Sequence, residues 1–115
     1  MDLKKVSAIF DELRLRNVEI ALIEHGVKGY TVCRAKGRGQ YFDSFNDGHL
    51  TTHVQLDIYT NSDNAHAIAQ LVLENAYSNC DNEGLVSIIS VETLFWIHDQ
   101  KQADPAEFNF RENKQ

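Results

Sequence analysis

The sequence has little of what marks secreted, membrane-spanning or nucleic-acid-binding proteins. Its two cysteines, Cys33 and Cys80, are far apart and match neither a disulfide framework nor a metal-binding spacing. It has one proline, and no stretch approaches the roughly 18 apolar residues that a membrane-spanning helix needs. No signal peptide is evident after Met1, so we expect a cytoplasmic protein with reduced thiols.

Positive charge is also scarce, because the 115-residue chain carries a formal net charge of −6. Nucleic-acid-binding domains present a clustered basic face, so nucleic acid is not an expected partner. The basic residues that do gather around one loop are Lys28, Arg34, Lys36 and Arg38. Four charges on a loop suit a small phosphate ligand better than a duplex. At this length we expect one domain with a modest core, which oligomerisation would enlarge.

Hydrophobic periodicity divides the chain into alternating strands and helices. The expected strands lie at 4–10, 29–34, 53–60, 85–91 and 93–98, and the expected helices at 12–25 and 64–77. Gly26 ends the first helix as a left-handed C-cap, and His25 lies in its last turn. Residues 61–63 supply turn and N-cap chemistry for the second helix.

This order, β-α-β-loop-β-α-β with a short extra strand, predicts a ferredoxin-like α+β fold. Two helices then cover one face of an antiparallel sheet, and the other face stays free for assembly. We expect one domain over 1–98, interrupted by a loop at 36–52 that holds three of the six glycines. Loops of this length in compact domains tend to be functional or mobile. Residues 99–115 are expected to form a loose tail, anchored by Phe108 and Phe110.

The most informative segment runs from Gly26 to Gln40 and is punctuated by glycines. Glycine has no Cβ, so the backbone there can approach a ligand closely, and successive N–H groups can form an anion-binding nest. Lysine and arginine in the same segment add charge-assisted hydrogen bonds to phosphate. The pattern alone fits a flexible surface loop as well as a ligand site.

The segments GVKGYTV and KGRGQ, followed by VQLDIYT, a helix and LVSIISVE, resemble the PII signal-transduction family over residues 3–98. The likeness is greatest to divergent PII-like proteins linked to inorganic carbon uptake, those associated with carboxysomes or with bicarbonate transporters. The resemblance implies a homotrimer that binds adenine nucleotides in clefts between subunits. It also implies that the loop at 36–52, the T-loop, responds to the effector and docks on a partner. No catalytic residue and no cofactor are implied, so the chain is not expected to be an enzyme.

By position, the resemblance implies a nucleotide site built from separate parts of the chain. Ile9 would pack near the adenine, Thr31 near the base and Asp57 near the ribose or base. The phosphates would meet the base of the T-loop and a second loop, the B-loop. The residues implied there are Gly37, Arg38, Gly39, Gln40, Asn82, Glu83 and Gly84.

Three positions depart from the family pattern. Leu85 replaces a B-loop lysine, and Trp96 and His98 replace two arginines on the last strand. Each lost cation removes a charge-assisted contact worth roughly 1.5–3 kcal/mol. ADP or AMP is therefore favoured over ATP, and bicarbonate is a candidate second effector. The implied protein partners are a bicarbonate transporter, which would recruit the protein to a membrane, or a carboxysome-related protein.

Two alternatives use the same trimeric fold without a nucleotide. One is an interaction module, and the other is a metal-handling protein that uses His49 and His53. These histidines straddle a loop and a strand start, so solvated side chains fit better than metal ligands. Trp96 fits packing or a subunit interface, or a place beside a nucleotide, and Cys33 reads as a core or interface residue.

Overall fold

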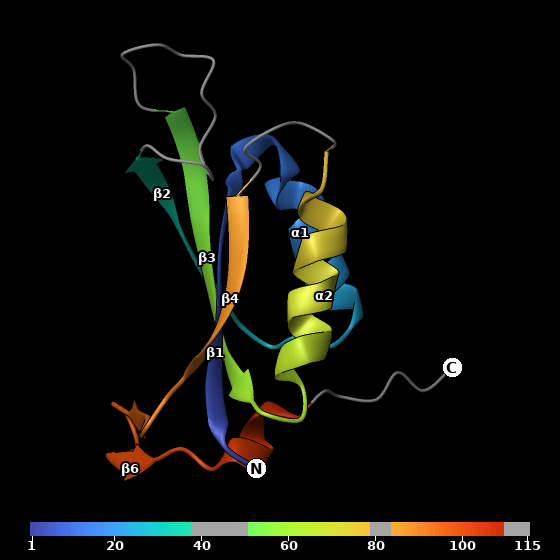
Figure 1. Ribbon diagram of the computed structural model, residues 1–115. Helices are drawn as coiled ribbons and strands as arrows, with labels where there is room; N and C mark the ends of the chain where they lie inside the picture. The colour runs from blue at the N-terminus through green and yellow to red at the C-terminus, as the bar shows by residue number, and fades with distance from the viewer. Residues whose placement is uncertain (38–50, 79–83, 110–115) are drawn as a thin grey trace.

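The computed structural model describes residues 1–37, 51–78 and 84–109 of the chain. A single antiparallel sheet in the order β2-β3-β1-β4 carries two helices on one face (Figure 1). The elements are β1 (Leu3–Asp11), α1 (Leu15–Glu24), β2 (Thr31–Gly37), β3 (Thr51–Asn61), α2 (Ala65–Ala76) and β4 (Gly84–Ser90). This order and topology confirm the predicted ferredoxin-like α+β fold.

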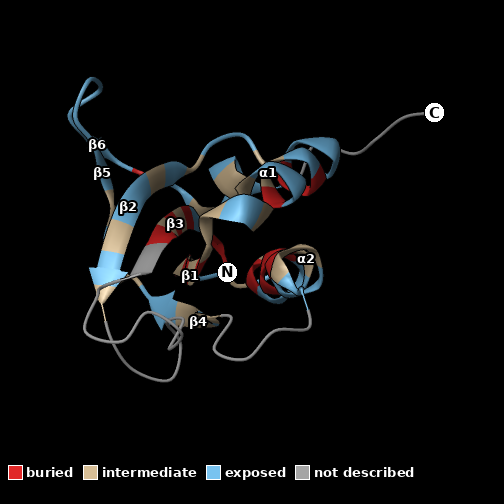
Figure 2. Cartoon of the chain, turned by 90° about the horizontal axis from the view of Figure 1, so that it is seen from above, coloured by how far each residue is buried: buried red, intermediate tan, exposed pale blue. Residues whose placement is uncertain are grey.

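The core lies between the helices and one face of the sheet, as the buried residues in Figure 2 show. Alternate residues of the central strands point into it, because successive side chains of a strand face opposite ways. Its fully or almost fully buried members include Val6, Phe10, Leu56, Ile58, Val18, Leu22, Ile68 and Val72. Burial of each such side chain contributes roughly 1.5–3 kcal/mol, which explains why both helices lie on this face.

The segment 12–25 begins as a short 3-10 helix, η1 (Glu12–Arg14), rather than as the α-helix that the spacing predicts. The carboxylate of Asp11 accepts a hydrogen bond from the Leu13 N–H at 2.9 Å, which fixes this tight turn. The Arg14 guanidinium then donates two hydrogen bonds, at 3.3 and 3.1 Å, to the carbonyl oxygen of Asn75 near the end of α2. This turn therefore ties the start of one helix to the end of the other.

The end of α1 follows the prediction. Gly26 has φ 84°, and the N–H groups of Gly26 and Val27 bond back to the carbonyls of Ile23 and Leu22. This is a Schellman motif, in which a residue without Cβ adopts the left-handed conformation. The His25 imidazole Nδ1 lies 2.9 Å from the carbonyl oxygen of Ala21 and covers the last turn. The chain then leaves the helix toward the sheet.

The first and last residues of the loop expected at 36–52 belong to strands. Lys36 pairs with Thr52 and Gly37 pairs with Thr51, so these residues continue the β2–β3 ladder. The sequence did not predict this pairing, because glycine has a low preference for strands and the segment is rich in glycine. Residues 38–50, and with them the predicted mobility of the T-loop, lie outside the described residues.

The predicted loose tail is wrong for residues 101–109. The expected extra strand is β5 (Phe95–Trp96), which pairs with β6 (Lys101–Gln102) in a small hairpin apart from the main sheet. A 3-10 helix, η2 (Pro105–Phe108), follows it. A capping box between Asp104 and Glu107, with Pro105 at the first turn, stabilises η2. The segment is polar yet ordered, and the anchoring role expected for Phe110 lies outside the described residues.

A substitution at the start of β4 tests this fold. Gly84 has φ 127°, and a Cβ there would lie 1.8 Å from the carbonyl oxygen of Ile9. We expect Gly84→Ala to lower the free energy of unfolding by about 2–3 kcal/mol, because strain and overlap add. Urea denaturation measures this loss. Gly29→Ala is the matched control, because a Cβ at Gly29 meets nothing within 4 Å. Equal stabilities of the two variants would contradict the β1–β4 geometry.

Candidate functional site

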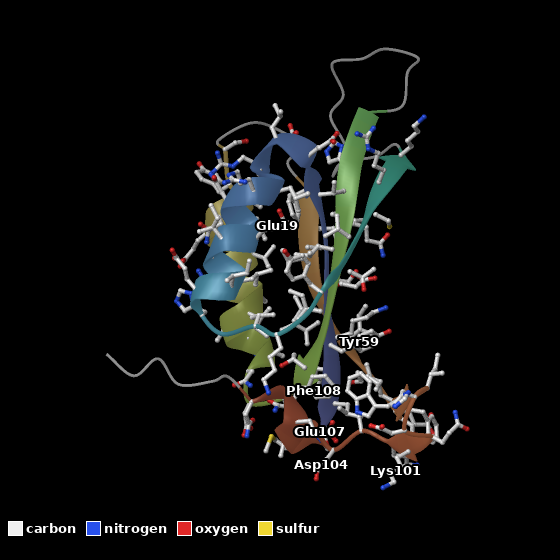
Figure 3. All side chains as sticks on the ribbon, turned by 180° about the vertical axis from the view of Figure 1, so that it is seen from behind. Glu19, Tyr59, Lys101, Asp104, Glu107 and Phe108 are labelled. Atoms are coloured by element: carbon white, nitrogen blue, oxygen red, sulfur yellow. The ribbon has the colours of Figure 1, made fainter. Side chains whose placement is uncertain are left out.

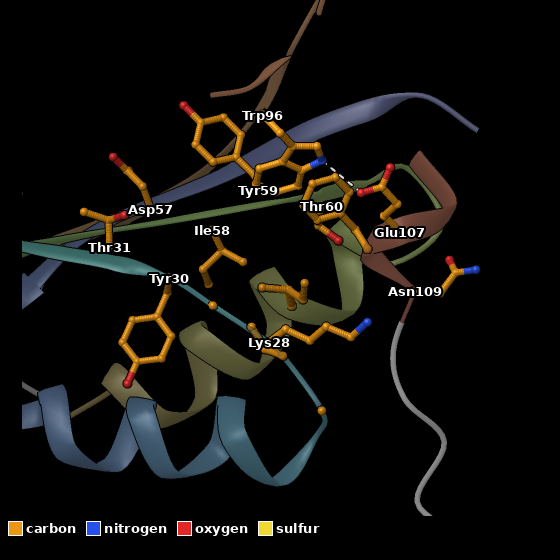
Figure 4. Close-up of a pocket in the computed structure, with 15 residues that line it drawn as sticks. Lys28, Tyr30, Thr31, Asp57, Ile58, Tyr59, Thr60, Trp96, Glu107 and Asn109 are labelled. Atoms are coloured by element: carbon orange, nitrogen blue, oxygen red, sulfur yellow. Dashed lines mark hydrogen bonds between the residues drawn. The ribbon is translucent and has the colours of Figure 1, made fainter. Parts of the chain in front are cut away.

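A cavity of about 660 Å³ lies where β3 extends beyond the end of β2. Thr31, the first residue of β2, pairs with Asp57, while β3 continues to Asn61. The connection from α1 to β2 forms one wall of the cavity, and the C-terminal segment forms another (Figure 4). The lining is completed by residues 57–60 of β3 and by Ile68 of α2. The cavity thus lies where β3 is no longer paired with β2, and side chains surround it.

Asp57 is held in a polar row across the open face of the sheet. The register places Thr31, Asp57, Ser7 and Ser87 side by side on the four strands. The Ser7 hydroxyl donates to Asp57 Oδ1 at 2.7 Å, and the Gln55 amide donates to Asp57 Oδ2 at 3.4 Å. Both carboxylate oxygens are therefore oriented before any ligand arrives, which lowers the entropic cost of binding.

The other predicted site residues fall into a second group. Ile9 lies on the same open face and pairs with Leu85, and Gly84 is the next residue along β4. Gly37 lies at the far end of β2, opposite Thr51. The structure therefore brings Thr31 to Asp57 and Ile9 to Gly84, but only the first pair lines the cavity. The predicted residues Arg38, Gly39, Gln40, Asn82 and Glu83 lie outside the described residues.

The residues predicted for the site do not include those of the C-terminal wall of the cavity. The indole Nε1–H of Trp96 donates to Glu107 Oε1 at 2.9 Å. The rings of Trp96 and Phe108 stack with centroids 5.8 Å apart at an interplanar angle of 26°. Figure 3 shows Glu107, Phe108 and Tyr59 at the same end of the molecule. The signal that can find this wall is the run Asp-Pro-Ala-Glu at 104–107, which is typical of a capped helical turn.

Two asparagines attach this wall to the main domain. The amide of Asn61, which is fully buried, donates to the Pro105 carbonyl at 2.8 Å and to Asn109 Oδ1 at 2.9 Å. The amide of Asn64 donates to the Phe108 carbonyl at 2.9 Å. Because a buried amide that loses its partners costs about 1–3 kcal/mol, these bonds hold η2 firmly against the end of β3.

The remaining polar groups of the cavity come from the opposite wall and the floor. Lys28 forms no ion pair within the described part of the chain, and its side chain extends toward Asn109 (Figure 4). Thr60 is 1% exposed, and its hydroxyl has no hydrogen-bond partner among the described residues. The lining therefore combines apolar surface with a few polar groups, as small-molecule sites do.

Tyr30 forms part of the wall beside α1. Its hydroxyl donates to Glu19 Oε2 at 3.0 Å. Burial raises the pKa of the Tyr30 phenol above its ordinary value of 10.0, and the hydrogen bond and negative charge of Glu19 raise it further. The protonated phenol is therefore the form that fixes this wall.

The structure also bears on the remaining predicted residues. His53 is 2% exposed, so the expectation of a solvated side chain is wrong, and His49 lies outside the described residues. In residues 1–37, 51–78 and 84–109, no group of three or more metal-ligating side chains comes together.

Cys33 is exposed on the open sheet face, which excludes a core role, and Cys80 is not described. Over the described residues, no helix is long and apolar enough to span a membrane.

A family model described as nitrogen regulatory protein P-II matches residues 3–101. The chain belongs to the PII family. The PII protein of Porphyra purpurea is 24% identical over 102 residues, which cover 83% of this chain and 91% of that protein. The PII homologue of Arabidopsis thaliana is 22% identical over 111 residues, which cover 90% of this chain and 57% of the homologue. The crystal structure of Arabidopsis thaliana PII bound to citrate superimposes with a TM-score of 0.76 at 20% identity, over 90% of each chain.

Family membership confirms the resemblance seen in the sequence at the level of PII proteins as a whole. These proteins are described as regulatory, which agrees with the expectation that the chain is not an enzyme. The structural match supports the fold alone, since its sequence identity is low.

The Tyr30 wall predicts a pH dependence of stability. The raised pKa means that the bond to Glu19 stabilises the fold below about pH 10 and is lost as pH rises through the folded-state pKa. Tyr30→Phe is expected to lower the free energy of unfolding by about 1 kcal/mol at neutral pH. It should also show a smaller loss of stability in alkali than the wild type. Urea titrations at neutral and alkaline pH measure both effects, with Tyr59→Phe as the control. A wild-type alkaline loss that Tyr30→Phe leaves unchanged would refute this role.

Proposed function

We propose that this PII protein is a homotrimeric regulator that binds an adenine nucleotide in clefts between its subunits, with ADP or AMP preferred over ATP. The observation that carries this proposal is the cavity of about 660 Å³, whose wall includes Thr31 and Asp57. The family resemblance places Thr31 near the base and Asp57 near the ribose or base. Occupation of the site would shift the population of T-loop states and so control binding of a protein partner.

The shape and chemistry of the cavity suit a nucleoside. Its volume lies within the roughly 300–1,000 Å³ that small-molecule sites occupy. Along 58–60, the β2-side edge of β3 has no strand partner in the described part of the chain, so backbone groups are available to a base edge. The oriented carboxylate of Asp57 can accept hydrogen bonds from ribose hydroxyls.

The charges near the site favour few phosphates. Lys28 is the single cation in the described lining of the cavity. Leu85, Trp96 and His98 occupy positions where the family pattern has cations. A triphosphate carries more negative charge than this set can neutralise, whereas one or two phosphates require less compensation.

Assembly and pathway complete the proposal. The open face of the sheet carries the apolar side chains of Tyr59, Leu85 and Ile89, each more than a third exposed, which a trimer would cover. The resemblance to carbon-linked PII-like proteins supports a cytoplasmic role in inorganic carbon metabolism. Bicarbonate is then a candidate second effector, and a bicarbonate transporter or a carboxysome-related protein is the candidate partner.

A ligand panel tests the nucleotide directly. We expect AMP and ADP to raise the melting temperature more than ATP at equal concentration, because a ligand that binds only the folded state stabilises it. Calorimetry gives the affinities, and bicarbonate, citrate and 2-oxoglutarate test second effectors. Asp57→Ala should weaken AMP binding about tenfold if it removes hydrogen bonds to the ribose, while Asp63→Ala on the exposed turn before α2 should not. Absence of all nucleotide binding at millimolar concentration would leave the interaction-module alternative.

A second variant tests the phosphate preference. Leu85→Lys restores a cation beside Gly84, so we expect it to strengthen ATP binding relative to AMP by about tenfold. Ile89→Lys adds the same charge farther along the same face of β4 and serves as the control. Calorimetry with both nucleotides gives the ratio. An ATP-to-AMP ratio that stays constant in Leu85→Lys would place the phosphates away from the start of β4.

A further inference from the structure

Trp96 lines the cavity at a position where the family resemblance implies an arginine. It is the only tryptophan in the chain, and it lines the cavity from the β5–β6 hairpin. It is 38% exposed, so part of its indole remains open to a ligand. Figure 4 shows Trp96 at the Glu107 end of the cavity, with Tyr59 between it and Asp57.

The indole is held in one orientation. One ring face stacks on Phe108, and Nε1 donates to Glu107 Oε1. Glu107 Oε2 accepts a hydrogen bond from the Asp104 N–H at 2.9 Å, so one carboxylate serves both the indole and the cap of η2. Asn61 and Asn64 hold that helix against β3 and α2. An aromatic side chain fixed in this way, with part of its surface exposed, is preorganised for a planar ligand.

We propose that Trp96 stacks on the aromatic ring of the effector and that Glu107 and Phe108 position the indole for this contact. The inference rests on the proposed function, because it takes the base of the nucleotide as the ring. An arginine at this position would contact phosphate through its charge, whereas an indole contacts the base through its π-face. Replacement of arginine by tryptophan therefore moves recognition from the phosphates to the base.

A base-centred site retains affinity for a nucleoside that lacks phosphate, because stacking does not depend on charge. Adenosine should therefore bind at the same place as AMP, and ribose 5-phosphate should bind much more weakly. Stacking on an aromatic side chain contributes about 1–3 kcal/mol per base, so removal of the indole should weaken binding about 5- to 150-fold.

The wild-type protein provides the first test, because a single tryptophan reports only on this site. The fluorescence of Trp96 is followed while AMP, adenosine or ribose 5-phosphate is added, and calorimetry is run in parallel. AMP and adenosine should change the tryptophan emission, and the dissociation constants from these titrations should equal those from calorimetry. Ribose 5-phosphate should leave the emission unchanged. AMP binding by calorimetry with unchanged emission overturns the stacking role and leaves the proposed function intact. If calorimetry detects no nucleotide, both proposals fail.

Matched variants provide the second test. Trp96→Ala should weaken AMP and adenosine binding by about 5- to 150-fold, and Trp96→Phe, which keeps an aromatic ring, should lose less affinity. Phe95→Ala removes an aromatic side chain from the same hairpin that does not line the cavity, so it is the control. The proposal is overturned if the wild type and Trp96→Phe bind AMP with equal affinity and AMP leaves the tryptophan emission of the wild type unchanged. This outcome decides the question even if Trp96→Ala does not fold.

The positioning role of Glu107 has its own readout. Glu107→Ala should shift the Trp96 emission of the free protein and weaken AMP binding severalfold, because the indole loses the hydrogen bond at Nε1. Glu107→Gln retains one carbonyl oxygen that can accept this bond but loses the second oxygen, which accepts from the Asp104 N–H, so it should restore part of the emission and of the affinity. Loss of affinity in Glu107→Ala with no change in emission, or no rescue by Glu107→Gln, overturns this positioning role.

Discussion

The site depends on the point at which β2 and β3 separate. Backbone pairing between them ends at Thr31 and Asp57, while β3 runs on to Asn61. The left-handed turn at Gly26 ends α1, and the Tyr30–Glu19 hydrogen bond keeps the following connection close to that helix. Because an unpaired strand edge must find other partners, this separation creates a ligand cavity or a site of assembly. We interpret it as a cavity, since side chains from three directions surround it.

The C-terminal segment completes the cavity and links it to the core. Asn61 ends β3 and also bonds to the turn before α2 through its Oδ1, which accepts from the Asn64 N–H at 3.0 Å. The same two asparagines hold η2. A change in the position of Trp96 or Glu107 would therefore move η2, which is hydrogen-bonded to the start of α2 through Asn64. This arrangement gives an effector a physical route to the C-terminal part of the chain.

Periodic patterns predicted the fold well and the site in part. The strand alternation at 53–60 gives the position of Asp57, and the family resemblance pairs it with Thr31 at one ligand. His53 follows the same alternation but is buried, because alternation does not show how the end of a strand is covered. The sequence indicates Trp96 as a candidate beside a nucleotide and Phe108 as an anchor of the tail, but it does not bring them together with Glu107 in one wall. That wall depends on hydrogen bonds from Asn61 and Asn64 to residues 44 positions away, which carry no periodic signal.

The central claim is that an adenine nucleotide binds where β2 and β3 separate. Backbone and indole NMR signals of the labelled protein, followed during addition of AMP, test it most directly. The account predicts that the largest shifts occur at the amides of Tyr30, Thr31, Tyr59 and Thr60 and at the indole N–H of Trp96. Saturable binding of AMP that leaves these signals in place, with shifts confined to other parts of the chain, would contradict it.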